Sequence, residues 1–238
     1  MKMRLDQALV AKGLVATRSQ AESYIKLGKV KVNGDEVRKS GHFVSETDDI
    51  MISVEQQYVS RAALKLASVA EQLNLDFNGK IVLDVGSSTG GFTDYALKSN
   101  ASKVIAVDVG TEQLHPSLRH DTRIELHEKT DIRYLSTLSD TPDIIVIDVS
   151  FISLKEILPH IAGLAGQDTK IVAMLKPQFE AGANDTNKGV IKNDTLRRKI
   201  LKEFEAWTKK LLIVVAKADS QIAGAKGNRE RFYLLKKK

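Results

Sequence analysis

An unbroken apolar run that ends in a glycine-rich turn constrains this chain more than any other stretch. Residues 81–85 read Ile-Val-Leu-Asp-Val, the pattern of a strand buried on both faces of a parallel sheet. Small residues follow over 86–91, and 92–98 has the spacing of an amphipathic helix. Glycine is expected in such a turn because a side chain would hold the backbone away from a ligand. A strand, a glycine turn and a helix in this order predict an α/β sheet with a nucleotide site beyond its strand ends.

The spacing of the glycines and of two acidic residues distinguishes among nucleotide ligands. A dinucleotide fingerprint has the form G-x-G-x-x-G, whereas here Gly86 is followed by Gly90 and preceded by Asp84. A carboxylate at that place would repel a pyrophosphate and attract a cation, and S-adenosylmethionine carries an amino group and a sulfonium but no phosphate. The next predicted strand ends in Asp108, at the separation where an acid accepts both ribose hydroxyls. The pattern favours S-adenosylmethionine over a purely structural turn with two solvated aspartates.

Three further polar residues stand at the ends of later predicted strands, where such sheets carry their sites. Asp131 is placed to meet an adenine amino group, and Asp148 and Lys176 directly follow apolar runs. A lysine next to a buried strand is unusual because its charge must be held or discharged. The residues that we expect to hold the cofactor are Asp84, Gly86, Ser88, Thr89, Gly90, Gly91, Phe92, Asp108 and Asp131.

From residue 58 onward, predicted strands alternate with predicted helices. This order indicates an α/β fold with a mostly parallel, doubly wound, Rossmann-like sheet. The last two strands are expected to form its antiparallel edge. Strands are predicted at 81–85, 103–108, 124–127, 143–148, 170–175, 211–216 and 231–235, and helices at 60–73, 92–98, 154–164 and 196–208.

Composition narrows the class of protein. The chain has 238 residues, of which 42% are hydrophobic, enough for a substantial core. It contains no cysteine, which excludes disulfides and thiolate metal sites and fits a cytoplasmic protein; no metal site is expected. No apolar run is long enough to span a bilayer, and the first residues do not resemble a signal peptide. The net charge of +6 favours a polyanionic partner, nucleic acid before membrane.

The first sixty residues differ from the rest. A helix from Leu5 is predicted to stop at Gly13, and a second helix, capped by Thr17 or Ser19, is predicted to end at Gly28. Short strands are predicted near 29–35, 36–38 and 49–54, which gives an α+β pattern. Up to Ser40 there are nine basic residues against four acidic ones. A solvated charged surface is the ordinary explanation, but such an excess in a small module favours nucleic acid. Polar residues 55–58 indicate a linker, so we expect one domain at 1–57 and a second at 58–238.

The small domain resembles the RNA-binding domain first seen in ribosomal protein S4. The matching pattern is Arg-Leu-Asp at 4–6, Thr-Arg-Ser-Gln-Ala at 17–21 and Ile-Lys-x-Gly-Lys-Val-x-Val-Asn-Gly at 25–34. The resemblance covers nearly the whole segment. It implies an RNA-binding face that contains Arg4, Arg18, Ser19, Gln20, Lys26, Lys29 and Lys31.

A second resemblance concerns the large domain. Lys65, Asp148, Lys176 and Glu230 occur in the order of the Lys-Asp-Lys-Glu tetrad of FtsJ-type RNA ribose 2′-O-methyltransferases. With the small N-terminal domain, the whole chain is similar to the TlyA family, which also carries the name hemolysin. The resemblance implies catalytic roles for these four residues, S-adenosylmethionine as cofactor, and ribosomal RNA or ribosomal subunits as partner, with cytidine as the modified base.

Physical chemistry supports the same four residues. A ribose 2′-hydroxyl is a weak acid, and its attack on a sulfonium methyl requires deprotonation and in-line placement. A lysine made neutral by burial and by a second nearby ammonium can take that proton. Lys176 is our candidate base, Lys65 the second cation, and Asp148 and Glu230 the groups that orient them. Taken singly, Lys65 would be read as a surface residue and Glu230 as a salt-bridging edge residue.

Two other functions stay open at this point. One is an RNA-binding or ribosome-assembly factor whose sheet is catalytically silent; intact Asp84, Asp108 and the four-residue set argue against it. The other is a membrane-active hemolysin, for which the sequence offers no spanning segment and no amphipathic basic helix of the membrane type. Tight, specific binding of S-adenosylmethionine is required only if the protein is a methyltransferase.

Overall fold

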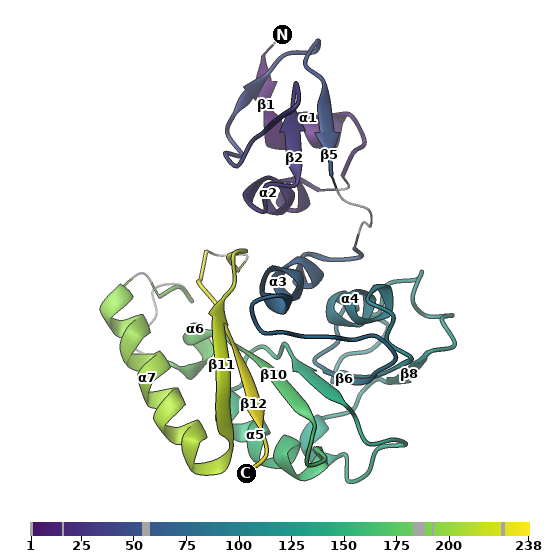
Figure 1. Ribbon diagram of the computed structural model, residues 1–238, viewed down its shortest axis with the longest axis vertical. Coiled ribbons are helices and arrows are strands. Elements are labelled where there is room, and N and C mark those ends of the chain that lie inside the picture. The colour runs from purple at the N-terminus through teal and green to yellow at the C-terminus, as the bar shows by residue number, and fades with distance from the viewer. Residues whose placement is uncertain (1, 16, 54–57, 183–188, 192, 225–226) are drawn as a thin grey trace.

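The structure is a computed structural model that describes residues 2–15, 17–53, 58–182, 189–191, 193–224 and 227–238. A small N-terminal body and a larger α/β body follow one another along the chain (Figure 1). The expected linker and the domain boundary between residues 57 and 58 fall at a gap, because 54–57 lie outside the described residues.

The N-terminal body packs two helices against short strands. Strands β2, β3 and β5 form an antiparallel sheet in the order β3-β2-β5, and Thr17 caps helix α2 by accepting a hydrogen bond from the Gln20 N–H. Helix α1 ends just before Gly13, which has φ +68°, as predicted, whereas the pairing of β1 with β4 was not predicted. The bounds are β1 Met3–Arg4, α1 Leu5–Ala11, α2 Arg18–Lys26, β2 Val30–Val32, β3 Asp35–Glu36, β4 Phe43–Val44 and β5 Ile50–Ile52.

In the described part of the larger body, seven strands form one mixed sheet in the order β11-β12-β10-β9-β6-β7-β8. The predicted pair at the edge is present, but only β12 runs against the other strands. It lies antiparallel between β10 and β11, so the outermost strand β11 again has the direction of the parallel strands. The bounds are β6 Ile81–Val85, β7 Lys103–Val107, β8 Ile124–His127, β9 Ile144–Ile147, β10 Lys170–Leu175, β11 Ile213–Asp219 and β12 Arg231–Lys236.

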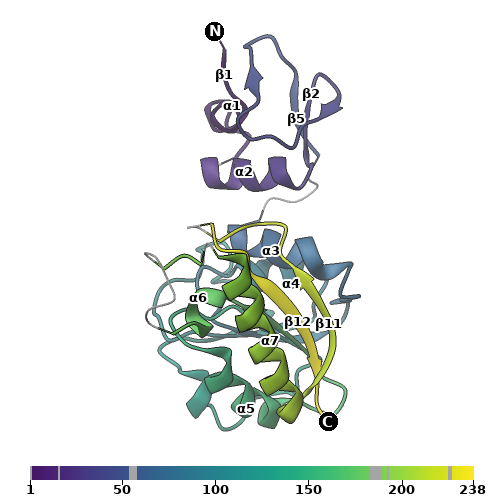
Figure 2. The ribbon, with the colours of Figure 1, turned by 90° about the vertical axis from the view of Figure 1, so that its left-hand side faces the viewer.

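Helices cover both faces of this sheet, as the alternating pattern predicts. Val82 of β6 faces a core shared with α3 and α4, whereas Leu83 and Val85 face a core shared with α5 and α7. Figure 2 shows α7 lying along β11 and β12 on the second face. The bounds are α3 Arg61–Ala70, α4 Gly91–Lys98, α5 Leu154–Leu164, α6 Pro177–Glu180 and α7 Asp194–Leu211, with a short 3₁₀ turn η1 at Ile132–Tyr134.

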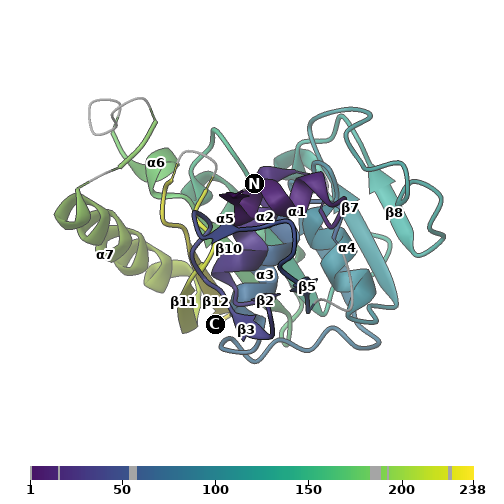
Figure 3. The ribbon, with the colours of Figure 1, turned by 90° about the horizontal axis from the view of Figure 1, so that it is seen from above.

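Helix α3 is where the two bodies meet. Leu64 of α3 packs within the N-terminal core, together with Ile222 from the segment after β11. Arg61 donates a hydrogen bond to the Ser19 hydroxyl of α2, and the Gln20 side chain donates to the Tyr58 carbonyl over 3.5 Å. Seen from above, α2 lies over α3 (Figure 3). The helix that carries Lys65 is therefore held between the two bodies.

Candidate functional site

A cavity of about 550 Å³ opens at the carboxyl ends of the central strands β6, β7 and β9. This is the point from which the chain extends the sheet in both directions, since β6 pairs with β7 on one side and β9 on the other. A smaller space of about 140 Å³ shares Gly86, Ser88 and Asp148 with it. Among the predicted cofactor residues, the larger cavity is lined by Gly86, Ser88, Asp108 and Asp131, and the smaller by Asp84, Gly86, Ser88, Thr89, Gly91 and Phe92.

Asp84 is a fully buried acid beside the smaller space. Its Oδ2 accepts a hydrogen bond of 2.6 Å from Thr93 Oγ1, whereas its Oδ1 has no hydrogen-bond partner among the described residues. Burial raises the pKa of Asp84 to about 7, and the nearby charges of Asp148 and Asp108 add to the rise. A buried carboxylate oxygen without a donor fits a ligand that brings its own positive charge, such as an ammonium group.

Asp108 is held rigidly at the end of β7. Its Oδ2 accepts from the Ser88 N–H at 2.8 Å and its Oδ1 from the Gly110 N–H at 2.7 Å. Each oxygen keeps a further lone pair, and the residue lines the larger cavity. The carboxylate is therefore oriented to accept two neighbouring hydroxyl groups, as a ribose presents them.

Asp131, which was predicted to meet an adenine amino group, contacts Arg133. Its carboxylate caps η1 through the Arg133 N–H and forms a forked pair with the Arg133 guanidinium, the shortest contact being 2.6 Å. Hydrogen bonds from Arg133 lower the pKa of Asp131. The residue lines the cavity, but Arg133 already occupies most of its accepting positions.

The glycines of the turn serve contacts within the protein as much as access for a ligand. Gly86 has φ +82°, and a Cβ there would lie 2.7 Å from the carbonyl oxygen of Asp148. Gly90 has φ +87° and faces leucine side chains, whereas a Cβ on Gly91 would overlap Ser60 at the start of α3. The sequence-based reason for these glycines was therefore incomplete: close packing of β9 and α3 against the turn requires them.

The four residues of the predicted set come from distant parts of the chain and form two ion pairs. Lys176 Nζ lies 2.6 Å from Asp148 Oδ1, and Lys65 Nζ lies 2.6 Å from Glu230 Oε2. The lysine side chains are only 10% and 11% exposed. Burial raises the pKa of Glu230, and the charge of Asp148 raises it further, whereas the charges of Lys65 and Lys176 lower it. Asp148 and Lys176 line the smaller space.

Several residues around Lys176 were not predicted individually. Lys176 Nζ donates to Ser150 Oγ at 2.8 Å and lies 5.9 Å from the centre of the Phe179 ring. Phe151 has φ +65° and is 91% exposed, with its ring 5.1 Å from that of Phe179. An exposed aromatic residue in a strained conformation beside a strand end is typical of a functional loop. The sequence signal was that each phenylalanine lies three residues after a predicted site residue, Phe151 after Asp148 and Phe179 after Lys176.

The half-buried carboxylate of Glu180 joins the two loops that carry these residues. Its Oε2 accepts from Ser153 Oγ at 2.6 Å and its Oε1 from the Leu154 N–H at 2.7 Å, at the start of α5. Burial raises the pKa of Glu180. The loop after β9 and the helix after β10 are thus tied together next to the Lys176–Asp148 pair.

The predicted RNA-binding residues of the N-terminal body fall into two groups. Lys26, Lys29 and Lys31 are exposed, and Arg4 and Arg18 both contact Asp6. Ser19 and Gln20, in contrast, make the contacts to Arg61 and Tyr58 between the two bodies. The five cationic residues are therefore available at the surface, whereas these two polar residues already bind the larger body.

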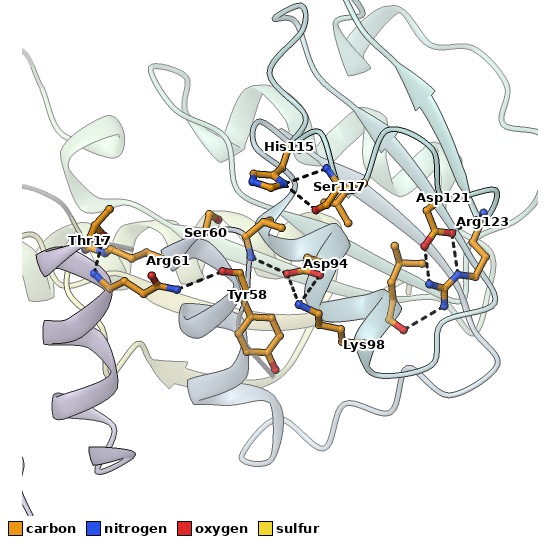
Figure 4. A pocket seen from close by; sticks show the side chains of 14 residues that line it. Thr17, Tyr58, Ser60, Arg61, Asp94, Lys98, His115, Ser117, Asp121 and Arg123 are labelled. Carbon is orange, nitrogen blue, oxygen red and sulfur yellow. Dashed lines mark hydrogen bonds and ion pairs between the residues drawn. The ribbon is translucent and has the colours of Figure 1, made fainter. Parts of the chain in front are cut away.

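A further cavity, of about 540 Å³, lies between the two bodies (Figure 4). Thr17 and Gln20 of α2 line it from one side, and residues of α3, α4 and the 115–123 segment from the other. Asp94 accepts from the Val59 N–H and pairs with Lys98, while Arg123 pairs with Asp121. None of Asp84, Asp108 and the four paired residues lines this cavity.

The order of the sheet strands and the acid-lined cavity at its centre are typical of α/β proteins that bind a nucleoside cofactor. The FtsJ-like methyltransferase family model matches residues 58–238, and an S4 domain model matches residues 3–50. The chain belongs to the FtsJ-like methyltransferase family, with an S4 domain at its N-terminus. The predicted fold class and the predicted methyltransferase activity are confirmed.

Relatives align over almost the whole chain. "Hemolysin A" of Brachyspira hyodysenteriae is 41% identical, with 96% of this chain and 97% of the relative aligned. The "23S rRNA (cytidine-2'-O)-methyltransferase TlyA" of Campylobacter jejuni is 37% identical over 97% and 98% of the two chains. A solved structure from Streptococcus thermophilus, described as a hemolysin, is 36% identical, covers 99% of this chain and 88% of its own, and has a TM-score of 0.74.

Proposed function

We propose that this protein transfers a methyl group from S-adenosylmethionine to a ribose 2′-hydroxyl of ribosomal RNA, with cytidine as the base. The observation that carries the proposal is the set of two buried lysine–carboxylate pairs directly beside the cofactor cavity. The activity named for the Campylobacter relative supports the same substrate. We place the reaction on ribosomal RNA or ribosomal subunits in the cytoplasm.

The cofactor would be held by groups already oriented in the free protein. The partnerless oxygen of Asp84 would accept its ammonium group, and Asp108 would accept the ribose hydroxyls. The turn 86–91 and Phe92 would enclose the remainder, with Asp131 at the far end of the cavity. When bound, S-adenosylmethionine supplies a methyl group on a positively charged sulfur.

Lys176 is the proposed base. In its neutral form, Nζ accepts the proton of the 2′-hydroxyl, and the ribose oxygen becomes the nucleophile. Asp148 and Ser150 hold Nζ in place beside the smaller space. Lys65 and Glu230 form the second ion pair of the set, and we propose that this pair helps to orient the reacting groups.

We propose that the two domains, which we place at 1–57 and 58–238, have separate tasks: the first binds RNA and the second transfers the methyl group. The N-terminal domain would hold RNA through the exposed cations Arg4, Arg18, Lys26, Lys29 and Lys31. Contacts of such side chains with phosphates give affinity that falls as salt rises. Because Ser19 and Gln20 contact the larger domain, we propose that they set the angle between the domains rather than bind RNA alone.

The test is methyl transfer from labelled S-adenosylmethionine to purified ribosomal subunits, followed by mass-spectrometric mapping of 2′-O-methylcytidine. Lys176→Ala should abolish transfer while calorimetric binding of S-adenosylmethionine persists. Lys80→Ala is the matched control, since Lys80 precedes β6 at the opposite end of the sheet and pairs with Asp143. Absence of cofactor binding in the wild type would favour a silent RNA-binding factor instead.

Lysis of erythrocytes by the purified protein would instead favour the alternative that the protein is a membrane-active hemolysin. No helix in the described ranges is long and apolar enough to cross a membrane.

A further inference from the structure

We propose that Asp6 is a positioning residue that presents Arg4 and Arg18 as one preformed pair for RNA phosphates. The side chain of Asp6 is fully buried, whereas those of Arg4 and Arg18 are 42% and 54% exposed. The inference rests on the proposed RNA substrate and adds a residue that does not itself reach the surface.

The Asp6 carboxylate accepts hydrogen bonds from two arginine side chains and one backbone N–H, and all of them favour its ionised form. Arg4 binds side-on, with Nε 3.0 Å from Oδ1 and Nη2 3.0 Å from Oδ2. Arg18 Nη2 lies 2.9 Å from the same Oδ2, and the Gln7 N–H donates to Oδ1 at 3.0 Å. Burial alone would raise the pKa of Asp6, but the bonds from Arg4 and Arg18 outweigh it and lower the pKa. One ionised carboxylate therefore holds both guanidinium groups.

The two arginines reach Asp6 from different parts of the domain. Arg4 immediately precedes α1, and Arg18 is the first residue of α2. Without the carboxylate between them, two guanidinium groups at this separation would repel each other. Asp6 is thus the group that allows two positive charges to converge on one place at the domain surface.

The contacts leave donors free for a ligand. A guanidinium has five N–H donors, and the bonds to Asp6 use Nε and Nη2 of Arg4 and Nη2 of Arg18. The Nη1 groups can therefore face phosphate oxygens in the forked geometry that arginine favours. An arginine fixed before binding loses less side-chain entropy when a phosphate arrives, which increases affinity without a new contact.

A purely structural role makes different predictions. Asp6 lies in the first turn of α1, where a carboxylate also stabilises the helix. In that case Asp6→Asn would lower the melting temperature, and the folded fraction would bind RNA at least as well as the wild type. Simple electrostatics points the same way, since the substitution removes a negative charge near the RNA. Preorganisation predicts the opposite sign: weaker binding by the folded protein.

The experiment compares full-length wild type, Asp6→Asn and Asp35→Asn in binding of purified ribosomal RNA at several KCl concentrations, below each melting temperature. We expect Asp6→Asn to weaken binding on the order of fivefold to twentyfold. The KM for RNA should rise by a similar factor, while kcat and the S-adenosylmethionine Kd are unchanged. Asp35→Asn removes an exposed acid of the same domain and should bind equally well or slightly better.

A coupling measurement separates positioning from loss of charge. Arg4→Ala should weaken RNA binding clearly in the wild type and much less in the Asp6→Asn background. Equal losses in both backgrounds, or RNA binding by folded Asp6→Asn that matches the wild type, would overturn the inference. If Asp6→Asn does not fold, Arg4→Lys and Arg18→Lys replace it: both keep the charge and lose the fork, so undiminished binding would contradict the inference.

Failure here is distinguishable from failure of the proposed function. A wild type that neither binds nor methylates ribosomal RNA would refute the proposed function. A wild type that methylates RNA, with a folded Asp6→Asn that binds as well, would refute only the role of Asp6.

Discussion

Two clusters of ion pairs, one in each domain, use the same kinds of group with opposite exposure. In the N-terminal domain the acid Asp6 is fully buried, and its arginines are about half exposed. In the catalytic domain the cations themselves are buried, since Lys65 and Lys176 are 11% and 10% exposed. The cluster in the N-terminal domain therefore exposes its positive charges to solvent, whereas the cluster in the catalytic domain buries them.

The difference in exposure matches the difference in residue type. Arginine stays protonated under all ordinary conditions, so a half-exposed arginine offers a permanent charge to a phosphate. A lysine withdrawn from water pays a desolvation cost, and its protonation state then depends on its neighbours. Arginine is therefore suited to holding RNA, and buried lysine to moving a proton.

The largest expected effect comes from replacing Lys176, the proposed base, by arginine. Lys176→Arg keeps the positive charge but cannot accept a proton, so methyl transfer should fall by about 10²–10⁴-fold. Binding of cofactor and RNA should change little. Single-turnover transfer measures this, with Lys80→Arg as control. An active Lys176→Arg enzyme would mean that Lys176 only positions the ribose, and Asp148 would be the next group to test.

A smaller effect is expected at the cofactor ribose. Asp108→Ala removes both accepting oxygens at the end of β7, which should weaken S-adenosylmethionine by about 1.5–3 kcal/mol, the usual scale for hydrogen bonds to a charged group. Titration calorimetry measures the change, and Asp121→Ala, outside this cavity, serves as control. Unchanged affinity would show that the cofactor does not lie along β7.

The pH dependence of cofactor binding tests the buried acid Asp84. Its pKa in the free protein is about 7, so at lower pH most molecules must lose a proton before they bind an ammonium group. Affinity for S-adenosylmethionine should therefore rise with pH up to about 7 and then level off, by up to about tenfold per pH unit. Asp84→Asn should bind weakly at every pH, and a wild-type affinity independent of pH between 5 and 8 would refute this role.

The raised pKa of Asp84 also affects the stability of the fold, but stability falls as pH rises whereas cofactor affinity increases. The folded protein holds the Asp84 proton more tightly than the unfolded chain, whose aspartate has the ordinary pKa near 4. Its contribution to the free energy of unfolding is thus largest at low pH and is lost as pH rises from about 4 to 7. Thermal melts of the wild type and Asp84→Asn without cofactor should converge at the acid end of this range.

The smallest effect concerns the exposed lysines. Lys29→Ala should weaken ribosomal RNA binding only severalfold and reduce the dependence of log affinity on log salt by about one. Cofactor affinity and the rate of the bound complex should not change. A loss of kcat in Lys29→Ala would break the distinction between charges that hold RNA and charges that act in the reaction.

The sequence allowed prediction wherever the local pattern and the structural environment agree. The strands at 81–85 and 170–175 and the glycine turn have the predicted bounds, because apolar strands buried on both faces leave little ambiguity. The half-buried edge strand at 124–127 also has its predicted bounds. The β1–β4 pair was missed because each strand has only two residues, too few to show a period. The direction of β12 within the sheet depends on tertiary packing alone.

By itself, the sequence determined the Rossmann-like class, the acids at the strand ends and the order of the Lys-Asp-Lys-Glu set. Only the tertiary structure decided that Lys65 pairs with Glu230 and Lys176 with Asp148, because these contacts join residues that local periodicity cannot relate. It also decided that the Asp131 carboxylate forms an ion pair with Arg133 and that the Asp6 carboxylate binds both Arg4 and Arg18. Charge pairing depends on distance and burial in three dimensions, and neither quantity is encoded in a local pattern of residue types.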